Sequence, residues 1–501
     1  MTPRLHRVAR PALFGVVAFL VSFAFSWVPS PWGDEAATVL SADRPWLSLA
    51  RMLPTVDAVH GVYYALMHVW IDAFGQSMIA LRLPSAVAVG FAAAGVVVLG
   101  DRLGSRRIGT IAGAVFLVLP RVTFMGGEAR SYALSAAAAV WLVVLIVHLL
   151  RRPGLRPRVW FAYSLALATS IGIFLYLGLL LPALAVAVVV PWLWRGRQRG
   201  RSAVVEPARW IRFTLLGILL AGPVIGFAIG QRNQISFLGD EQAVTLHTLV
   251  VTQWFGSSPV AVFGWSAIAV ALVVGVVESR RHARAHDAAP SLLALSTATV
   301  FVPMLILTVV NALVAPIYTT RYLSFATPFV ALLMALGIST ITRQFAVHTV
   351  VVVGLAVLVL PVYVAQRQPF AQDGGSDWAE VARAVGERVR PGDAIVFDDD
   401  VGNSRKPRAV KYLYRSDFAG LVDVALKTPY AQTSGMRDVT RSIEASAAAL
   451  RATDGRVWFV DYRGLSGDRP NQLAELERLG YRVTLTVGLH RDTLYRLDRR
   501  A

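Results

Sequence analysis

Apolar stretches long enough to cross a membrane recur along the first 365 residues of the chain. A helix needs about 20 apolar residues to cross the hydrocarbon core. The chain has about eleven candidate stretches, of which all but the third come close to this length. They cover approximately residues 11–28, 79–100, 108–120, 133–150, 159–175, 177–194, 212–230, 259–277, 291–312, 324–340 and 346–364. The pattern predicts a polytopic α-helical membrane protein with about eleven transmembrane helices.

The pattern changes after residue 365. An amphipathic helical segment precedes the short apolar strand Ala394–Phe397, RVWFVDYRG reads as another strand, and a helix and two strands follow. Alternating helices and strands predict a small α/β domain. We therefore expect a transmembrane domain over residues 1–365 and a C-terminal extracytoplasmic α/β domain over residues 366–501.

The composition agrees with this fold class. Mean hydropathy is +0.55, and only 16% of the residues are charged, against about 25% in soluble domains. The chain has no cysteine, which excludes disulfides, thiolate metal sites and a cysteine nucleophile.

The net charge of +18 suggests nucleic acid at first sight, but the arrangement of the arginines argues against it. Many lie in short clusters between apolar stretches, as in residues 102–107, 151–158 and 195–201. Such clusters are typical of cytoplasmic loops beside anionic lipid. We expect membrane lipids as partners, no nucleic acid, and a multi-pass protein of the plasma membrane whose active site and C-terminal domain are extracytoplasmic.

The sequence WGDEA, directly after the first apolar stretch, places Asp34 and Glu35 side by side. Ionised groups beside the hydrocarbon are costly and often mark function. The alternative is that the two acids simply end a helix and face water. We expect the segment 29–78 to be a catalytic first outer loop.

The same loop contains aromatic and polar residues at helical spacing. His60, Tyr64 and His68 follow one another at intervals of four and would share a helix face. We expect Asp57, His60 and Tyr64 to bind substrate. Interfacial packing of an amphipathic helix is the alternative.

Two further outer loops supply Glu128 with Arg130, and Arg321 with Tyr322. A carboxylate can remove the proton of an attacking hydroxyl, and arginine suits a phosphate leaving group. Glu128 is a candidate substrate ligand or a structural partner of Arg130. Arg321 could instead contact phospholipid headgroups. No nucleotide-binding motif faces the cytoplasm, which favours a lipid-carried sugar donor.

The acid run Asp398–Asp400 follows a predicted strand, where ligands bind in open α/β sheets. No glycine-rich phosphate loop accompanies it, so we expect a solvated acidic loop.

The segments WGDEA, YYALMHVWIDAFGQSMIALRLPSAV, EARSYAL and RYLSFATP resemble the GT-C glycosyltransferases. The branch that they resemble most is the protein mannosyltransferase-like family 39 of actinobacterial enzymes that use polyprenyl-phosphate sugars. The resemblance covers roughly residues 10–365. It implies a multi-span fold, a catalytic acid in the first outer loop and an undecaprenyl- or decaprenyl-phosphate-linked sugar as donor.

By position, the resemblance assigns the general base to Asp34 and makes Glu35 its partner or a metal ligand. It assigns the donor phosphate to Arg130 and Arg321, with Tyr322 beside them. Adjacent carboxylates could hold Mg or Mn, although two ligands do not define a site. The C-terminal domain has no counterpart in the resemblance, so the acceptor stays open among a glycan, a lipid and a protein.

These observations predict a glycosyltransferase that moves mannose from a polyprenyl-phosphate donor. A pentose such as arabinose is an alternative sugar. Non-enzymatic alternatives are a transporter of lipid-linked sugars, which would favour charges at the midplane and inverted repeats, and a membrane scaffold.

Overall fold

The computed structural model describes residues 3–152, 154–188, 205–231, 244–281, 291–453, 456–463 and 471–499. The chain divides into two compact units, each continuous in space but not in sequence. The helical unit comprises Met1–Ala24, Asp57–Tyr63 and Arg82–Val364, and the mixed unit comprises Phe25–Val56, Tyr64–Leu81 and Ala365–Ala501. Contacts therefore group most of the first outer loop with the C-terminal part of the chain. The predicted domain boundary at residue 365 stays a prediction.

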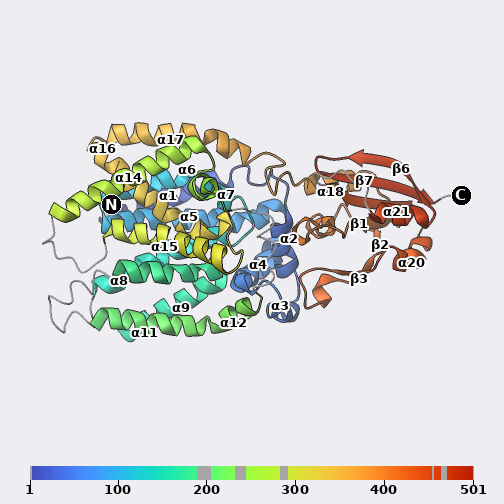
Figure 1. Cartoon of the computed structure of the whole chain (residues 1–501), viewed down its shortest axis with the longest axis horizontal. Helices are drawn as coiled ribbons and strands as arrows, with labels where there is room; N and C mark the ends of the chain where they lie inside the picture. The colour runs from blue at the N-terminus through green and yellow to red at the C-terminus, as the bar shows by residue number, and fades with distance from the viewer. Residues whose placement is uncertain are drawn as a thin grey trace. The chain divides into compact units, whose positions relative to one another are not determined.

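Long apolar helices make up the helical unit (Figure 1). Six of the helices in the described residues are long and apolar enough to cross a membrane: α5 (Met78–Leu103), α8 (Tyr132–Arg151), α14 (Ser258–Arg281), α15 (Leu292–Leu313), α16 (Thr327–Ile341) with the preceding turn η6 (Thr320–Ala326), and α17 (Phe345–Ala365). Two bent pairs bring the number to eight, namely α6 (Arg106–Val118) with α7 (Pro120–Gly126) and α11 (Val205–Leu220) with α12 (Gly222–Gly230). The predicted multi-pass helical fold is confirmed.

The predicted number of about eleven spans is not settled by these helices. It requires shorter apolar helices, such as Val8–Phe23 of α1 (Pro3–Phe23) and Leu175–Val188, to cross as well. The helix α9 (Pro157–Ile173) covers the predicted fifth span. The count stays a prediction.

Helix α16 is the centre of the helical unit and is buried along most of its length. It packs against α6, α14 and α15. A Cβ atom added at Gly337 would lie 1.9 Å from the carbonyl oxygen of Ala267 in α14. The absence of a side chain at Gly337 thus lets two helix backbones touch, as small residues do in membrane helix pairs.

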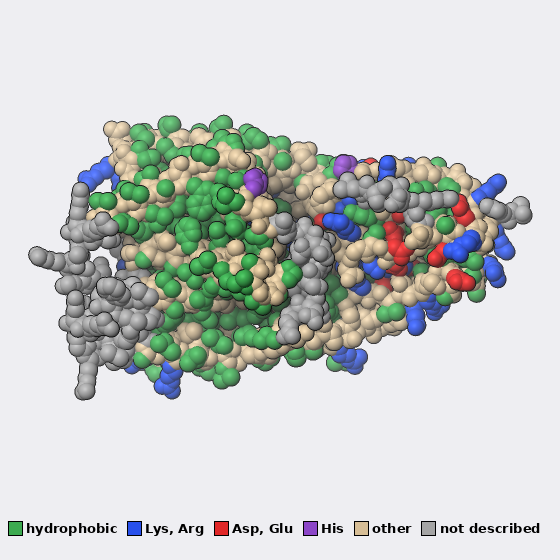
Figure 2. Space-filling model, in the orientation of Figure 1, with side chains coloured by type: hydrophobic (Ala, Val, Ile, Leu, Met, Phe, Trp, Pro, Cys, Tyr) green, Lys and Arg blue, Asp and Glu red, His purple; other side chains and the backbone are tan. Residues whose placement is uncertain are grey.

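The outer surface of the helical unit is apolar, and hydrophobic side chains dominate its visible face in Figure 2. Along α17, Val350, Val353 and Val357 have 71%, 56% and 65% of their surface exposed. Water would make such a contiguous apolar face unfavourable. A surrounding bilayer removes that cost.

Residues of the predicted cytoplasmic loops contact one another. The contacts are Arg10 with Asp101 and with the carbonyl of Arg106, Arg151 with the carbonyl of Arg102, and Arg107 with the carbonyl of Thr342. The sequence analysis predicted that all of these residues lie on the cytoplasmic side of the membrane. Their contacts place them together at one end of the helical unit. The basic loop at 195–201 lies outside the described residues.

The C-terminal part of the mixed unit is a five-stranded sheet in the order β2-β1-β5-β7-β6. Strand β1 runs parallel to β2 and β5, whereas β7 is antiparallel to β5 and β6. The bounds are β1 (Ala394–Phe397), β2 (Val422–Asp423), β5 (Arg456–Tyr462), β6 (Tyr481–Gly488) and β7 (Asp492–Arg499), with a separate antiparallel pair of β3 (Leu426–Thr428) and β4 (Val439–Thr440). Helices α18 (Trp378–Gly386), α20 (Ala447–Arg451) and α21 (Asn471–Arg478) accompany the sheet. The predicted α/β domain is confirmed, and strand β1 has the predicted bounds.

The expectation of a solvated acidic loop after β1 is wrong for Asp398. Its side chain is buried, and its backbone N–H donates to the carbonyl of Val460 at 2.9 Å. Asp399 lies 3.7 Å from Lys406 Nζ, and only Asp400 is exposed. The reason is that β5 lies beside β1 and continues past its end, which covers the first acid of the run.

Candidate functional site

The predicted catalytic pair lies at the start of a short helix, α2 (Gly33–Ala42), in the mixed unit. Asp34 and Glu35 occupy its first turn after the extended residue Trp32, where the partial positive charge of a helix N-terminus stabilises carboxylates. Glu35 is buried and Asp34 is partly exposed. Their roles as base and partner stay predictions.

Gly33 brings the backbone of α2 against the C-terminal part of the chain. A Cβ atom at this position would lie 1.9 Å from the carbonyl oxygen of Ser404, closer than atoms can approach. Helix α2 also packs against the turns η7 (Asn403–Arg405) and η8 (Pro407–Ala409) and against α19 (Val410–Leu413). The N-terminus of α2 is therefore held by the segment that follows β1.

The end of α2 is fixed by the buried side chain of Arg44. Its Nε donates to the carbonyl of Leu40 at 3.0 Å, and Nη2 donates to the carbonyls of Gly435 and Met436 at 3.2 and 3.1 Å. The guanidinium also lies over the ring of Tyr430, 5.4 Å from its centroid. Arg44 thus joins the C-terminus of α2 to the segment before β4.

The residues before α2 are anchored in the same way. The Ser30 N–H donates to the carbonyl of Pro369 at 2.7 Å, and the Ser376 hydroxyl donates to the carbonyl of Pro31 at 2.6 Å. Since both ends of α2 are tied to the C-terminal part of the chain, the position of Asp34 depends on residues that follow the last apolar helix.

Helix α4 (Gly61–Phe74) carries two of the aromatic and polar residues of the first outer loop. Tyr64 is fully buried and interacts electrostatically with Arg44. His68 Nδ1 lies 2.7 Å from the carbonyl oxygen of Ala42, and its ring packs 4.0 Å from that of Trp46. These contacts give both side chains a packing role in the mixed unit, and substrate binding by Tyr64 stays a prediction.

The predicted helix face of His60, Tyr64 and His68 extends across the start of an α-helix, and it stays a prediction. The α-helix begins at Gly61, and His60 ends the preceding turn η1 (Ala58–His60), which belongs to the helical unit. Asp57 precedes this turn with a φ of 57°, in the left-handed region that aspartate tolerates better than most residues. Asp57 therefore turns the chain, and its role as a substrate ligand stays a prediction.

His60 lies at the centre of a buried polar and aromatic cluster in the helical unit. Its Nε2 is 3.0 Å from Arg130 Nη2, and its Nδ1 is 2.9 Å from the hydroxyl of Ser131. The ring stacks on Phe174, with centroids 5.3 Å apart and planes within 7°. The Ser85 hydroxyl donates to the carbonyl of Arg130 at 3.3 Å. Backbone and side chain of Arg130 are both held in place.

Tyr322 joins this cluster from the turn η6. Its ring centroid lies 4.5 Å from that of Tyr176, 5.6 Å from that of Phe174 and 6.5 Å from that of Tyr132. Arg321 precedes it and is partly exposed. The aromatic rings thus bring the loop of Arg321 beside the loop of Arg130.

A second connection between these loops runs through Gln253. Arg121 Nε donates to the carbonyl of Gln253 at 2.8 Å, and the Gln253 amide donates to the carbonyl of Thr320 at 2.6 Å. Arg121 also interacts electrostatically with Glu128 and Arg321. The predicted phosphate ligands and the buried Glu128 therefore lie together in the helical unit. Asp34 and Glu35 belong to the mixed unit, and convergence of all three loops stays a prediction.

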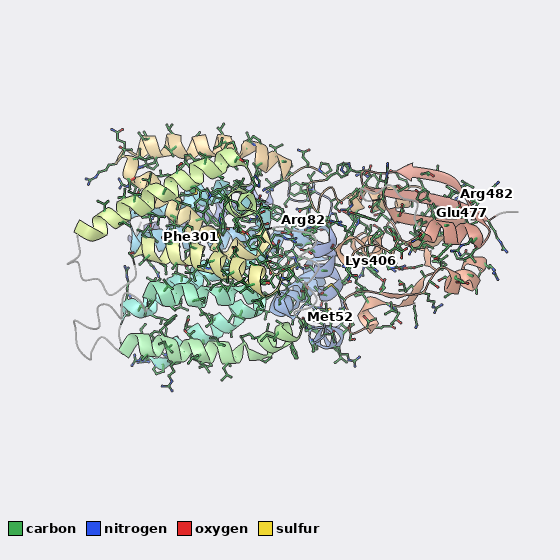
Figure 3. The ribbon with its side chains drawn as sticks, viewed as in Figure 1. Met52, Arg82, Phe301, Lys406, Glu477 and Arg482 are labelled. Carbon is green, nitrogen blue, oxygen red and sulfur yellow. The ribbon has the colours of Figure 1, made fainter. Side chains whose placement is uncertain are left out.

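The sequence prediction did not include several buried polar residues, among them Arg44, Arg82 and Ser131. Arg82, labelled in Figure 3, is fully buried near the start of α5. An arginine inside an apolar helical stretch is itself a signal of function, so Arg82 could have been found. Arg44 and Ser131 carry no such signal, because their partners are distant in sequence.

The possible divalent cation has no complete set of protein ligands in the part of the chain that the structure describes. No group of three or more His, Asp or Glu residues there could hold a metal ion. Hard cations take six or more oxygen ligands, which substrate and water often complete. A Mg or Mn ion at Asp34 or Glu35 stays a prediction.

The multi-pass helical domain with a small C-terminal sheet has the GT-C fold, which it shares with solved structures of ArnT. The crystal structure of ArnT from Cupriavidus metallidurans in the apo state matches 97% of this chain and 97% of that chain, with a TM-score of 0.56. The structure of ArnT from the same organism bound to undecaprenyl phosphate matches the same shares, with a TM-score of 0.57. Sequence identity is 12% in both comparisons, so the similarity concerns the fold.

The archaeal oligosaccharyltransferase AglB from Archaeoglobus fulgidus, in complex with an inhibitory peptide and a dolichol-phosphate, matches 90% of this chain and 69% of that chain at 12% identity. The TM-score of this comparison is 0.49. No protein-family model matches the sequence, and no curated protein matches it. The GT-C fold expected from the sequence is confirmed, whereas the family 39 branch stays a proposal.

Proposed function

We propose that this protein is a glycosyltransferase of the plasma membrane that moves a sugar from a polyprenyl-phosphate donor to an extracytoplasmic acceptor. Mannose is the proposed sugar, and a glycan, lipid or protein is the acceptor. The observation that carries the proposal is the placement of Asp34 and Glu35 in the first turn of α2, within a chain that shares the fold of ArnT over nearly its whole length. The undecaprenyl phosphate of that ArnT structure supports a polyprenyl phosphate as the lipid here.

The proposed reaction is a single displacement at the anomeric carbon. The hydroxyl oxygen of the acceptor forms a bond to the anomeric carbon, and Asp34 accepts the proton that this hydroxyl loses. The bond between the anomeric carbon and the phosphate oxygen breaks, and the polyprenyl phosphate leaves with both bonding electrons. Arg130 and Arg321 stabilise the negative charge that grows on the phosphate, because a guanidinium donates two parallel hydrogen bonds to it.

The geometry around Arg130 supports this role. A buried arginine needs its donors directed at acceptors, and His60 and the backbone contact with Ser85 fix the orientation of its side chain and main chain. The neighbouring rings of Phe174 and Tyr322 give the cluster an apolar wall. Such a wall excludes water and strengthens the interaction between an arginine and a phosphate.

The test is sugar transfer in membranes of a deletion strain complemented with the protein, using radiolabelled polyprenyl-phosphate-mannose. Asp34→Asn keeps the shape of the side chain and removes the base, so transfer should be abolished without loss of membrane insertion. Asp72→Asn is the matched control, because Asp72 is 69% exposed on α4 of the same unit, and it should transfer as the wild type does.

Retained transfer in Asp34→Asn membranes would exclude Asp34 as the base. Transfer from a polyprenyl-phosphate-pentose but not from the mannose donor would replace mannose and keep the reaction. No transfer from either donor would favour a transporter or a scaffold.

A further inference from the structure

The mixed unit contains a pocket of about 150 Å³ beside helix α2. Leu40 of α2 forms one part of its wall, and residues of the segment between β1 and β4 form the rest. Lys406, labelled in Figure 3, comes from the turns after β1, and Arg437 comes from the residues before β4. An apolar cavity of about this size accommodates benzene, so the pocket has room for one six-membered ring.

The charged side chains of the wall are unequal in number. Lys406, Arg408 and Arg437 are basic, whereas only Asp399 and Asp438 are acidic. The pocket therefore has an excess of positive charge, although the wall alone does not say which cation is available to a ligand.

The two acids already have other partners. Asp438 accepts hydrogen bonds from the Tyr412 hydroxyl at 2.7 Å and from the Tyr430 N–H at 2.8 Å, and it lies 3.3 Å from Lys411 Nζ. Asp399 lies 3.5 Å from Arg408 Nη2. Among the described residues, no ion pair that includes Arg437 is found, so neither Asp399 nor Asp438 is its ion-pair partner.

Two of the three cations are also engaged. Arg408 pairs with Asp423 through Nη1 in addition to Asp399, and Lys406 has Asp399 as its partner at 3.7 Å. In the part of the chain that the structure describes, Arg437 is the wall cation for which no side-chain hydrogen bond or ion pair is found. Arg437 is thus the available cation of the pocket.

The surroundings of Arg437 favour the binding of an anion. The side chain is partly buried, and loss of hydration lowers the pKa of Arg437 to about 10, against the opposing effect of the carboxylates of Asp34 and Asp399. The loss of hydration outweighs these favourable interactions, so the charged form of Arg437 is less stable than it would be in water. An anion that reaches the guanidinium replaces the lost water with charge-assisted hydrogen bonds.

The electrostatic interaction with Asp34 relates the pocket to the proposed base. Arg437 responds to the charge of Asp34, and both lie in the mixed unit. Leu40 of α2 also lines the pocket, so a molecule held at Arg437 lies beside α2. In the proposed reaction, the molecule that meets Asp34 through a hydroxyl is the acceptor.

We propose that this pocket binds an anionic sugar residue of the acceptor, one that carries a phosphate or carboxylate group, with Arg437 as the main ligand of the anion. The assignment to the acceptor rests on the proposed function, whereas anion binding by the pocket does not. The pocket selects a charged acceptor and holds its hydroxyl-bearing ring beside α2.

The test measures binding of glucose 6-phosphate and of glucose to the full-length protein in detergent by titration calorimetry. Glucose 6-phosphate should bind, glucose should not, and Arg437→Gln should weaken phosphate binding by about tenfold or more, as loss of a charge-assisted hydrogen bond does. Arg482→Gln is the matched control, because Arg482 is exposed on β6 of the same unit (Figure 3), and it should bind as the wild type does.

Arg437→Lys keeps the charge and loses the fork of donors, so it should bind with intermediate affinity and serves if Arg437→Gln does not fold. Equal binding by wild type and a folded Arg437→Gln would overturn the proposal. Equal affinity for glucose, or no binding of glucose 6-phosphate at millimolar concentration, would overturn it as well.

A competition with undecaprenyl phosphate separates the two sources of a phosphate. Displacement of glucose 6-phosphate by this lipid would overturn the assignment to the acceptor, and no displacement would support it. Asp34→Asn removes a negative charge that acts on Arg437, so it should bind glucose 6-phosphate at least as tightly as the wild type while losing sugar transfer. For the wild type, sugar transfer without phosphate binding would refute the pocket alone. Phosphate binding by the wild type without sugar transfer from either donor would refute the proposed function and with it the acceptor role.

Discussion

Arg130 and His60 share a hydrogen bond in which the direction of donation is fixed, with Nη2 3.0 Å from Nε2. A guanidinium has donors only, so Nε2 of His60 must accept. The ring proton then lies on Nδ1, which faces the Ser131 hydroxyl at 2.9 Å. His60 is a neutral imidazole that orients Arg130.

Replacing His60 with phenylalanine tests this relationship. The variant keeps a ring to stack on Phe174 but removes the acceptor for Arg130. We expect the apparent KM for the polyprenyl-phosphate donor to rise about tenfold, the usual effect of losing a hydrogen bond to a charged group. Transfer assays at varied donor concentration measure it.

His247→Phe is the control, because His247 is exposed and outside the cluster. An unchanged donor KM in His60→Phe would show that Arg130 does not need His60 for its orientation.

Arg130→Lys keeps the positive charge and removes the planar fork. Because lysine cannot form two parallel hydrogen bonds with a phosphate, we expect donor use to fall by about tenfold or more. Arg156→Lys, at an exposed position, should have no effect. An apparent donor affinity equal to that of the wild type would argue against a phosphate role for Arg130.

Gly33→Ala should destabilise the mixed unit, because the added Cβ meets the backbone of Ser404. Overpacking of this kind costs about 1–3 kcal/mol. We expect a lower melting temperature and a loss of sugar transfer, since α2 must move. Gly402→Ala adds the same atom where nothing lies within 4 Å, and a melting curve as low as that of Gly33→Ala would contradict this explanation.

Asp461 predicts how stability depends on pH. Burial, followed by the nearby charge of Asp398, raises the pKa of Asp461 from 3.8 to about 7. The folded state therefore binds a proton that the unfolded state has lost, and stability decreases as pH rises from about 4 through 7. Burial raises the pKa of Asp492 too, which adds a dependence of the same sign.

Asp461→Asn removes the carboxyl group that binds one of these protons in the folded state. Its melting temperature should fall less than that of the wild type between pH 5 and pH 8. Asp400→Asn, at an exposed position, should keep the wild-type dependence. Parallel pH profiles for wild type and Asp461→Asn would show that Asp461 does not titrate in this range.

Local sequence signals predicted the elements that depend on neighbours in sequence. The strand Ala394–Phe397 is an apolar run after a Pro-Gly-Asp turn, and its bounds are as expected. The four-residue spacing of His60, Tyr64 and His68 continues through the turn at His60, so the spacing alone did not show that the α-helix begins at Gly61. The burial of Asp398 could not be predicted, because the covering residue Val460 belongs to a strand that follows much later.

The candidate site shows the same limit. Asp34, Arg130 and Arg321 stand out in the sequence as charges beside apolar stretches. Arg437 does not, because its significance depends on the partners that Asp438 and Asp399 have taken. Only a folded chain shows which of several neighbouring charges is left for a ligand.

The contact between Arg44 and the carbonyl of Gly435 joins residues 391 positions apart. A ribosome that adds about 5–20 residues per second takes about 20 to 80 seconds to travel that distance. During this interval α2 has left the ribosome while the residues that hold both of its ends do not yet exist. The nascent chain must therefore keep its first outer loop from aggregating until translation is nearly finished, and α2 gains its complete set of contacts only at the end of synthesis.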